Sequence, residues 1–285
     1  IRTMAVVAVL AVMLYCELRL RIGTGARRGA SSRDERGRMS TENRMASLEL
    51  SPKTLARTGG ALYVFIIVAG IFGEAFVRDA LIVSGNAAAT AANIAAHEGL
   101  WRLGIAGDLL MHVADLPLLV ILYVLMRPVN RDLALLVVLF DAVQSAVLVA
   151  SKMSLLTPLF ALGDAGYLKA FTPEQLQAIS YLSMRMDAHG FGFGLVFFGC
   201  GCLVLGWLIR RSTFLPWILG ALIQLAGACY LVNSFALILA PSLASAMFPV
   251  ILLPAFVAES LLALWLLIKG VDLPRWNARV AEMRG

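Results

Sequence analysis

The chain has little charge and few of the side chains used in metal or nucleophilic chemistry. Only 15% of its 285 residues are charged, against about a quarter in a typical soluble domain, and 60% are hydrophobic. Cys200 and Cys202 point about 200° apart on a helix, and no Gly-x-Ser-x-Gly motif occurs. These shortages exclude a soluble globular domain, a disulfide framework and a zinc ribbon.

The excess of basic residues is local. Residues 1–44 contain nine arginines and four acidic residues, so they account for +5 of the formal net charge of +6. The rest of the chain is close to neutral and has no basic patch interleaved with aromatic residues. We therefore expect no nucleic-acid partner.

The N-terminal region differs from the rest. Its apolar run, Met4–Cys16, is shorter than the roughly 20 residues that a membrane-spanning helix needs, and no small-residue cleavage site follows it. We expect residues 1–50 to be a disordered tail or an over-extended start. Met4, Met39 and Met45 all stay open as start positions, and so does an extra membrane segment at residues 4–16.

Long hydrophobic runs dominate the remainder, and they predict an all-α integral membrane protein built as a bundle of six transmembrane helices. We expect this domain at residues 51–271, followed by a cytoplasmic C-terminal tail at 272–285. The six predicted spans are approximately 58–78, 103–126, 132–157, 188–209, 214–239 and 246–268.

Basic residues flank these spans unequally. Ten Lys or Arg residues lie at the ends on one side, among them Lys53, Arg131 and Lys269, against four on the other. Because Lys and Arg are retained on the cytoplasmic side, we expect both termini to be cytoplasmic, in the bacterial cytoplasmic membrane.

Two connections on the opposite side are longer than turns. The Ala-rich loop 79–101 predicts a short helix. In loop 158–187, Thr172 followed by Pro173 and Gln175 is a helix-start signal, and this helix can continue into the fourth span. Aromatic residues near the predicted membrane boundaries, such as Tyr63 and Trp101, are interpreted as interfacial anchors.

Several stretches resemble the bacterial membrane family known as domain of unknown function 4386, in order and over roughly residues 53–270. They are ARTGGALYVFIIVAGIFGEAFVRDALIVSGNAAATAANI, LWRLGIAGDLLMHVADLPLLVILYVLMRPVNRDLALL, AHGFGFGLVFFGCGCLVLGWLI, TFLPWILG and LLPAFVAESLLALWLLIKG. The resemblance implies a six-helix integral membrane protein and no particular activity.

Ionisable residues within the spans are the candidate site. Asp108, His112 and Asp115 share one helical face, and Asp141, Ser145 and Lys152 share another. Such residues are costly in a bilayer and usually face a cavity or a partner. We expect a ligand-binding site formed by Glu74, Arg78, Arg102, Asp108 and His112, with Lys152, His189 and Asn233 behind them. Arg78 and Arg102 would hold an anionic group.

We therefore expect a non-enzymatic protein that binds or translocates a small polar solute, an ion or a lipid headgroup through an outward-facing polar pocket. No cofactor is predicted, and the lipid bilayer is the expected partner, with homo-oligomerisation left open. One alternative is a metal-dependent intramembrane hydrolase of lipids, with zinc held by Asp108, His112 and His189. Another is a non-catalytic sensor or accessory subunit.

Overall fold

The structure, a computed structural model, describes residues 51–284, and this part of the chain consists of helices and their connections, with no strand. Six helical segments of 19 to 39 residues are long and apolar enough to cross a membrane. They confirm the all-helical class and the six predicted spans. Their bounds are Pro52–Leu81, Glu98–Met126, Arg131–Ala161, Pro173–Arg211, Trp217–Leu239 and Val250–Ile268.

Three of the spans contain more than one helical element. The first comprises α3 (Pro52–Ile71), the π-helical η1 (Phe72–Arg78) and α4 (Asp79–Leu81); the third comprises α7 (Arg131–Lys152), η2 (Met153–Leu156) and α8 (Thr157–Ala161). The last comprises η4 (Val250–Leu252) and α12 (Leu253–Ile268), and the others are α6 (Glu98–Met126), α9 (Pro173–Arg211) and α10 (Trp217–Leu239). Outside the spans lie α5 (Ala87–Ala96), η3 (Gly166–Ala170), α11 (Pro241–Met247) and α13 (Leu273–Arg284).

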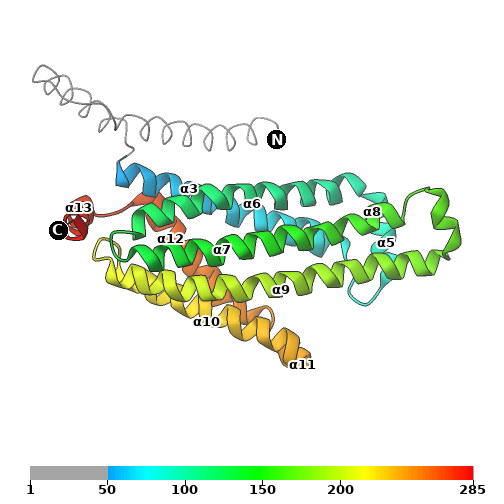
Figure 1. The fold of residues 1–285 in the computed structure, drawn as a ribbon. Coiled ribbons are helices and arrows are strands. Elements are labelled where there is room, and N and C mark those ends of the chain that lie inside the picture. Colours follow the sequence, from blue (N-terminus) through cyan, green and yellow to red (C-terminus); the bar gives the residue numbers. More distant parts are fainter. Residues whose placement is uncertain (1–50, 285) are drawn as a thin grey trace, which may run out of the picture.

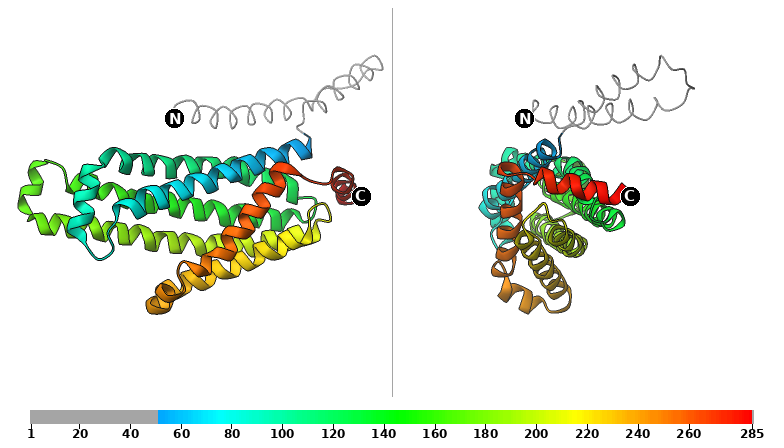
Figure 2. Two further views of the ribbon diagram at one scale, coloured as in Figure 1. Left: turned by 180° about the vertical axis from the view of Figure 1, so that it is seen from behind. Right: turned by 90° about the vertical axis from the view of Figure 1, so that its left-hand side faces the viewer.

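The six spans form a closed ring in which each packs against the next along the chain. The neighbouring pairs are α3–α6, α6–α7, α7–α9, α9–α10, α10–α12 and α12–α3. Figure 1 shows α6, α7 and α9 running side by side, while α10 and α12 tilt away from them towards α11; Figure 2 shows the same divergence from behind. The interior of this ring is where polar side chains can be sequestered from lipid.

The two ends of the bundle are distinct. At the end that we call the terminal end, Arg57 of α3 donates to the backbone carbonyl of Ile268 at 3.2 Å, and Trp276 of α13 donates to that of Leu125 at 3.3 Å. The opposite end, which we call the far end, carries α5 and η3 (Figure 1). Residues 272–285, expected to be a tail, thus include a helix that is hydrogen-bonded to the bundle.

The surface of the bundle is apolar, while several charged groups are enclosed. Large hydrophobic side chains are exposed along the spans, for example Val68, Phe76 and Leu116 at 54–64%. Asp108 and Lys152 are instead 1% and 6% exposed. A soluble protein has the reverse distribution, so the outer face is suited to lipid.

Local sequence signals at the far end behave as predicted. Thr172 caps α9 through a complete capping box, in which its hydroxyl accepts from the backbone of Gln175 and its own backbone N–H donates to the Gln175 side chain. The helix then continues without a break to Arg211, so the predicted helix before the fourth span is part of that span. The predicted short helix in loop 79–101 is α5.

Glycines permit some of the closest helix contacts, among them Gly194 in the HGFGFG stretch of α9. A Cβ added to Gly194 would lie 2.7 Å from a methyl group of Leu148 on α7. Farther along α9, a Cβ at Gly199 would lie 2.9 Å from the backbone carbonyl of Gly227 on α10. Small residues let membrane helices approach at backbone distance, so these glycines have a packing role.

The interpretation of Tyr63 and Trp101 as interfacial anchors is wrong. Tyr63 is only 7% exposed, and its hydroxyl donates to Glu259 of α12. Trp101 is 1% exposed, and its indole donates to the backbone carbonyl of Leu155 at 2.8 Å. Both side chains face the interior because helix packing, rather than depth in the membrane, determines their orientation.

Candidate functional site: ionisable groups inside the helix ring

Four charged side chains from four spans meet in the far half of the bundle, and we call them the four-charge network: Arg78, Asp108, Lys152 and Asp187. Two guanidinium nitrogens of Arg78 contact the two carboxylate oxygens of Asp108, at 2.7 and 3.3 Å. The Lys152 ammonium lies 2.9 Å from Asp187 and 3.8 Å from Asp108. The bidentate pair is a strong and directional form of ion pair.

The local backbone explains how Arg78 reaches the interior. It ends η1, and single π-helical turns rotate a helix face and are frequent at functional sites. Gly73, in the same segment, leaves room for the ion pair: a Cβ there would lie 2.7 Å from an oxygen of Asp108 and 2.9 Å from a nitrogen of Arg78. A larger residue at this position would have to displace the paired carboxylate and guanidinium groups.

The network balances its own charge. It contains two cations and two carboxylates, and Asp108, Lys152 and Asp187 are each at most 6% exposed. Glu74, whose side chain is 62% exposed, also accepts from Arg78 at 2.6 Å. A neutral, fully paired set adds little net stability, but loss of one partner leaves a buried charge and costs about 3–5 kcal/mol.

The structure brings together some of the predicted site residues and separates others. Glu74, Arg78, Asp108 and Lys152 are joined, whereas Arg102 forms an exposed i,i+4 pair with Glu98 at 2.6 Å. His189 contacts the backbone carbonyl of its own helix at Arg185. Asn233 is buried on α10, and among the described residues no hydrogen bond links it to the network.

Sequence reasoning missed Asp187. The fourth span was predicted to begin at residue 188, so Asp187 fell one residue outside it. In the structure α9 begins at Pro173 and runs without a break, so Asp187 lies within the span. The available signal was electrostatic: a lysine within a span requires a carboxylate partner. Ser151 also donates to Asp187, at 3.2 Å, so a hydroxyl and an ammonium both hold this carboxylate.

A second group, the mid-span cluster, comprises His112, Asp115, Asp141, Ser145 and Glu259. The imidazole Nδ1 of His112 lies 3.1 Å from a carboxylate oxygen of Asp115, and the Ser145 hydroxyl donates to that same oxygen at 3.1 Å. Two buried polar atoms of this cluster have no hydrogen-bond partner within residues 51–284: His112 Nε2 and Asp141 Oδ1.

Glu259 ties three helices together towards the terminal end. It accepts hydrogen bonds from Tyr63 of α3, at 3.1 Å, and from Tyr230 of α10. The carboxyl groups of Asp115 and Asp141 lie close enough to Glu259 for like-charge repulsion between them. The mid-span cluster therefore contains three carboxyl groups and one imidazole.

The two groups lie one after the other along the bundle axis. At 1.5 Å per residue, Asp108 and Asp115 of α6 are about 10 Å apart along the axis, and Lys152 and Asp141 of α7 about 16 Å. Ionisable side chains thus follow one another from the far end to the middle of the ring, on the inner faces of neighbouring spans.

The arrangement lends no support to a zinc centre at Asp108, His112 and His189. Asp108 is paired with Arg78, His112 with Asp115, and His189 with backbone. Within the described part of the chain, no three His, Cys, Asp or Glu side chains gather in a group that could hold a metal ion.

Six apolar spans closed into a ring, with charged groups inside and hydrophobic groups outside, define a multi-pass α-helical membrane protein. Residues 58–270, most of the chain, match the family described as "Domain of unknown function (DUF4386)", and the chain belongs to that family. This confirms the resemblance seen in the sequence.

A relative is found among known proteins of an archaeon. An uncharacterised protein of Archaeoglobus fulgidus is 28% identical over 171 residues, which cover 59% of this chain and 85% of the relative. No solved structure matches the chain.

Proposed function

We propose that the protein binds protons at the mid-span cluster and conducts them through the ionisable groups of that cluster, inside the helix ring. This is the ion case of the binding or translocation role expected from the sequence. The observation that carries it is a set of carboxyl groups at mid-bundle that lack a Lys or Arg partner. Among the described residues, none of Asp115, Asp141 and Glu259 forms an ion pair with Lys or Arg.

Electrostatics favours a proton as the ligand. Three carboxyl groups and one imidazole leave a net negative charge when the carboxyls are ionised, and an uncompensated charge in an apolar environment is very costly. Each proton bound removes one unit of that negative charge without requiring the space and the several oxygen ligands that a metal cation needs. Protonation should stabilise Asp141 most, because its Oδ1 has no hydrogen-bond partner in the described structure.

The same groups can relay protons between neighbours. An imidazole can accept a proton at one nitrogen and release one from the other. In His112, Nδ1 faces Asp115 while Nε2 is unpaired in the described structure. The Ser145 hydroxyl bridges from α7 to Asp115. Groups on α6 and α7 that can accept and release protons therefore lie next to one another, as in the proton relays of pumps and transporters.

The four-charge network has a different role in this proposal. Its carboxylates are already neutralised by Arg78 and Lys152, so it holds α6, α7 and α9 around the cluster. Arg78 is engaged by Glu74 and Asp108, and Arg102 lies on the surface, so the geometry favours protons over the anionic solute that these two arginines suggested.

For the orientation, we propose that the terminal end faces the cytoplasm and that the protein resides in a prokaryotic cytoplasmic membrane. The support is the excess of Lys and Arg at that end, where Lys53, Arg131 and Lys269 lie at or beside helix termini. Cysteine labelling from either side of intact cells, at Lys169 and at Lys269 replaced by Cys, tests the orientation.

Proton conduction is tested in liposomes that contain the purified full chain and an internal pH-sensitive dye. A potassium diffusion potential drives protons inward, and the rate of internal acidification is measured for the wild type, Asp141→Asn and His112→Gln. We expect rapid acidification in the wild type and at least a tenfold slower rate in both variants, because each loses a group that binds the proton.

The matched control is Asp132→Asn, which removes a carboxylate from the exposed first turn of the same helix, α7. It should conduct like the wild type. A wild-type rate equal to that of empty liposomes, with the protein folded, would refute conduction and would favour the sensor or accessory-subunit alternative. Equal rates in all variants would refute the assignment of the cluster.

A further inference from the structure

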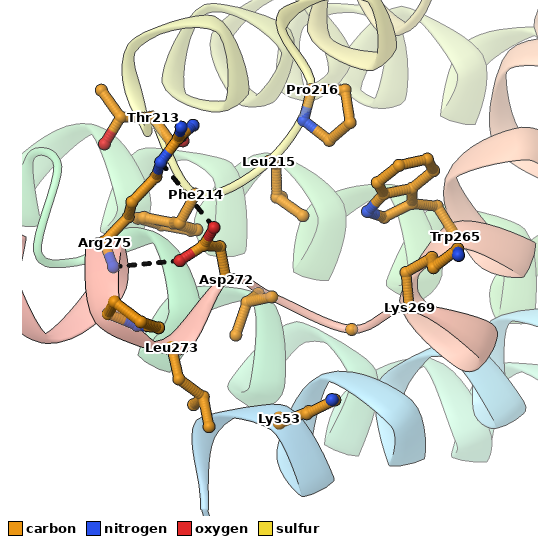
Figure 3. Close-up of a pocket in the computed structure, with 13 residues that line it drawn as sticks. Lys53, Thr213, Phe214, Leu215, Pro216, Trp265, Lys269, Asp272, Leu273 and Arg275 are labelled. Atoms are coloured by element: carbon orange, nitrogen blue, oxygen red, sulfur yellow. Dashed lines mark hydrogen bonds and ion pairs between the residues drawn. The ribbon is translucent and has the colours of Figure 1, made fainter.

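A cavity of about 550 Å³ lies at the terminal end, away from the ionisable groups inside the ring. Four parts of the chain line it: the start of α3, the link between α9 and α10, the end of α12 and the start of α13. Figure 3 shows Lys269 and Trp265 on one side of it, Arg275, Asp272 and Thr213 on the other, and Lys53 from α3.

The charge of this cavity is positive. Three basic residues line it, and the one acidic residue, Asp272, is engaged by Arg275, whose backbone N–H and guanidinium Nε lie 3.1 and 3.7 Å from its carboxylate. Arg275 also donates to the backbone carbonyl of Thr213 at 3.1 Å. Lys53 and Lys269 have no carboxylate partner in residues 51–284, so two ammonium groups are available to an anion.

Two residues that line this cavity have a positive φ. Gly270 has a φ of 71°, and a Cβ there would lie 3.1 Å from the Lys53 side chain, so the turn after α12 packs closely against the start of α3. Thr213 has a φ of 60°, which a β-branched residue adopts only at a cost. Strained conformations of this kind cluster at ligand-binding positions.

The cavity lies where the spans end. α9 finishes at Arg211, α10 begins at Trp217 and α12 finishes at Ile268, which is 60% exposed on the surface of the bundle. Half-buried Trp265 lines the same cavity, and tryptophan favours the headgroup level of a bilayer. A phosphate group at this depth would therefore have acyl chains beside the exposed faces of α10 and α12.

We propose that this cavity binds the phosphodiester headgroup of an anionic phospholipid, held by Lys53 and Lys269. Basic pockets at the ends of membrane helices commonly take such headgroups, and each basic side chain near an anionic lipid surface contributes about a fivefold gain in affinity. The proposal is independent of proton conduction, because no residue of the mid-span cluster lines the cavity.

The test is native mass spectrometry and lipid titration of the full chain in detergent. The probes are phosphatidylglycerol, phosphatidylcholine with the same acyl chains, and inorganic phosphate. We expect phosphatidylglycerol to bind far more tightly than phosphatidylcholine, and Lys53→Gln with Lys269→Gln to weaken it roughly 30-fold. The charge-matched control is Lys169→Gln with Arg185→Gln at the far end, which should bind like the wild type.

A gain-of-affinity variant gives a result that misfolding cannot imitate. Asp272→Asn keeps an N-cap for α13 but frees Arg275, so phosphatidylglycerol should bind about fivefold more tightly. Equal binding of the two lipids, or no loss in the double lysine variant, would overturn the proposal. Displacement of phosphatidylglycerol by millimolar phosphate would also overturn it, because the site would then be specific for free phosphate.

Discussion

Replacement of Lys152 by methionine removes one charge from the four-charge network while keeping an unbranched side chain that is only one atom shorter. Asp108 retains Arg78, but Asp187 retains only the Ser151 hydroxyl. At the observed 2.9 Å, the attraction between Lys152 and Asp187 is about 6 kcal/mol with an effective dielectric constant of ~20. Desolvation of both ions offsets much of this attraction, but the carboxylate left behind is still desolvated.

We therefore expect Lys152→Met to lower the free energy of unfolding by about 3–5 kcal/mol. The second change, Asp187→Asn, should restore most of the loss, because it removes the unpaired charge and leaves an amide that can still bond Ser151. The measurement is a double-mutant cycle of unfolding in mixed micelles, with titration by a denaturing detergent. Lys169→Met, at an exposed far-end position, is the control and should change the free energy by less than ~0.5 kcal/mol.

The double-mutant cycle also separates structure from function. If the network holds the helices around the mid-span cluster, the double variant should be stable and should conduct protons like the wild type. Losses for the single variants that simply add in the double variant would refute the claim that Lys152 and Asp187 act as a pair. A Lys152→Met variant as stable as the wild type would refute the burial of the charge.

Three further predictions follow from single contacts. Gly73→Ala should destabilise the protein by about 1–3 kcal/mol, because its Cβ would push apart the paired guanidinium and carboxylate; Gly107→Ala, whose Cβ meets open space on α6, should not. Tyr63→Phe should cost about 1–2 kcal/mol, because the Glu259 carboxyl loses one donor. Arg102→Gln should alter stability by less than ~0.5 kcal/mol and leave proton flux unchanged, because its ion pair is exposed. Detergent-unfolding titrations test the three stability predictions.

Much of the fold could be predicted from the sequence because each span is a local property of the chain. About 20 consecutive apolar residues, a Thr172 cap or an Ala-rich helical segment in a loop need no knowledge of neighbours. The ring order also follows the chain. The rotation of each helix is different: it depends on packing against partners, which is why Tyr63 and Trp101 were assigned to the membrane boundary although both face the interior.

The site was predicted in part for the same reason. Ionisable residues within apolar spans are conspicuous in the sequence, so Arg78, Asp108 and Lys152 were all predicted to belong to the site, and the structure brings them together. Arg102 was grouped with them by depth, but its side chain faces outward towards Glu98. Asp187 was missed because the fourth span was taken to begin at residue 188, although the helix that starts after Thr172 continues into it without a break.

The measurement that tests the central claim most directly is the reversal potential of the current through a bilayer containing the protein, with a pH difference across it. If protons are the ions carried, this potential should shift by about 59 mV for each unit of pH difference and stay constant when sodium or potassium is varied. A current that follows sodium or potassium, or no current above that of Asp141→Asn, would contradict the claim.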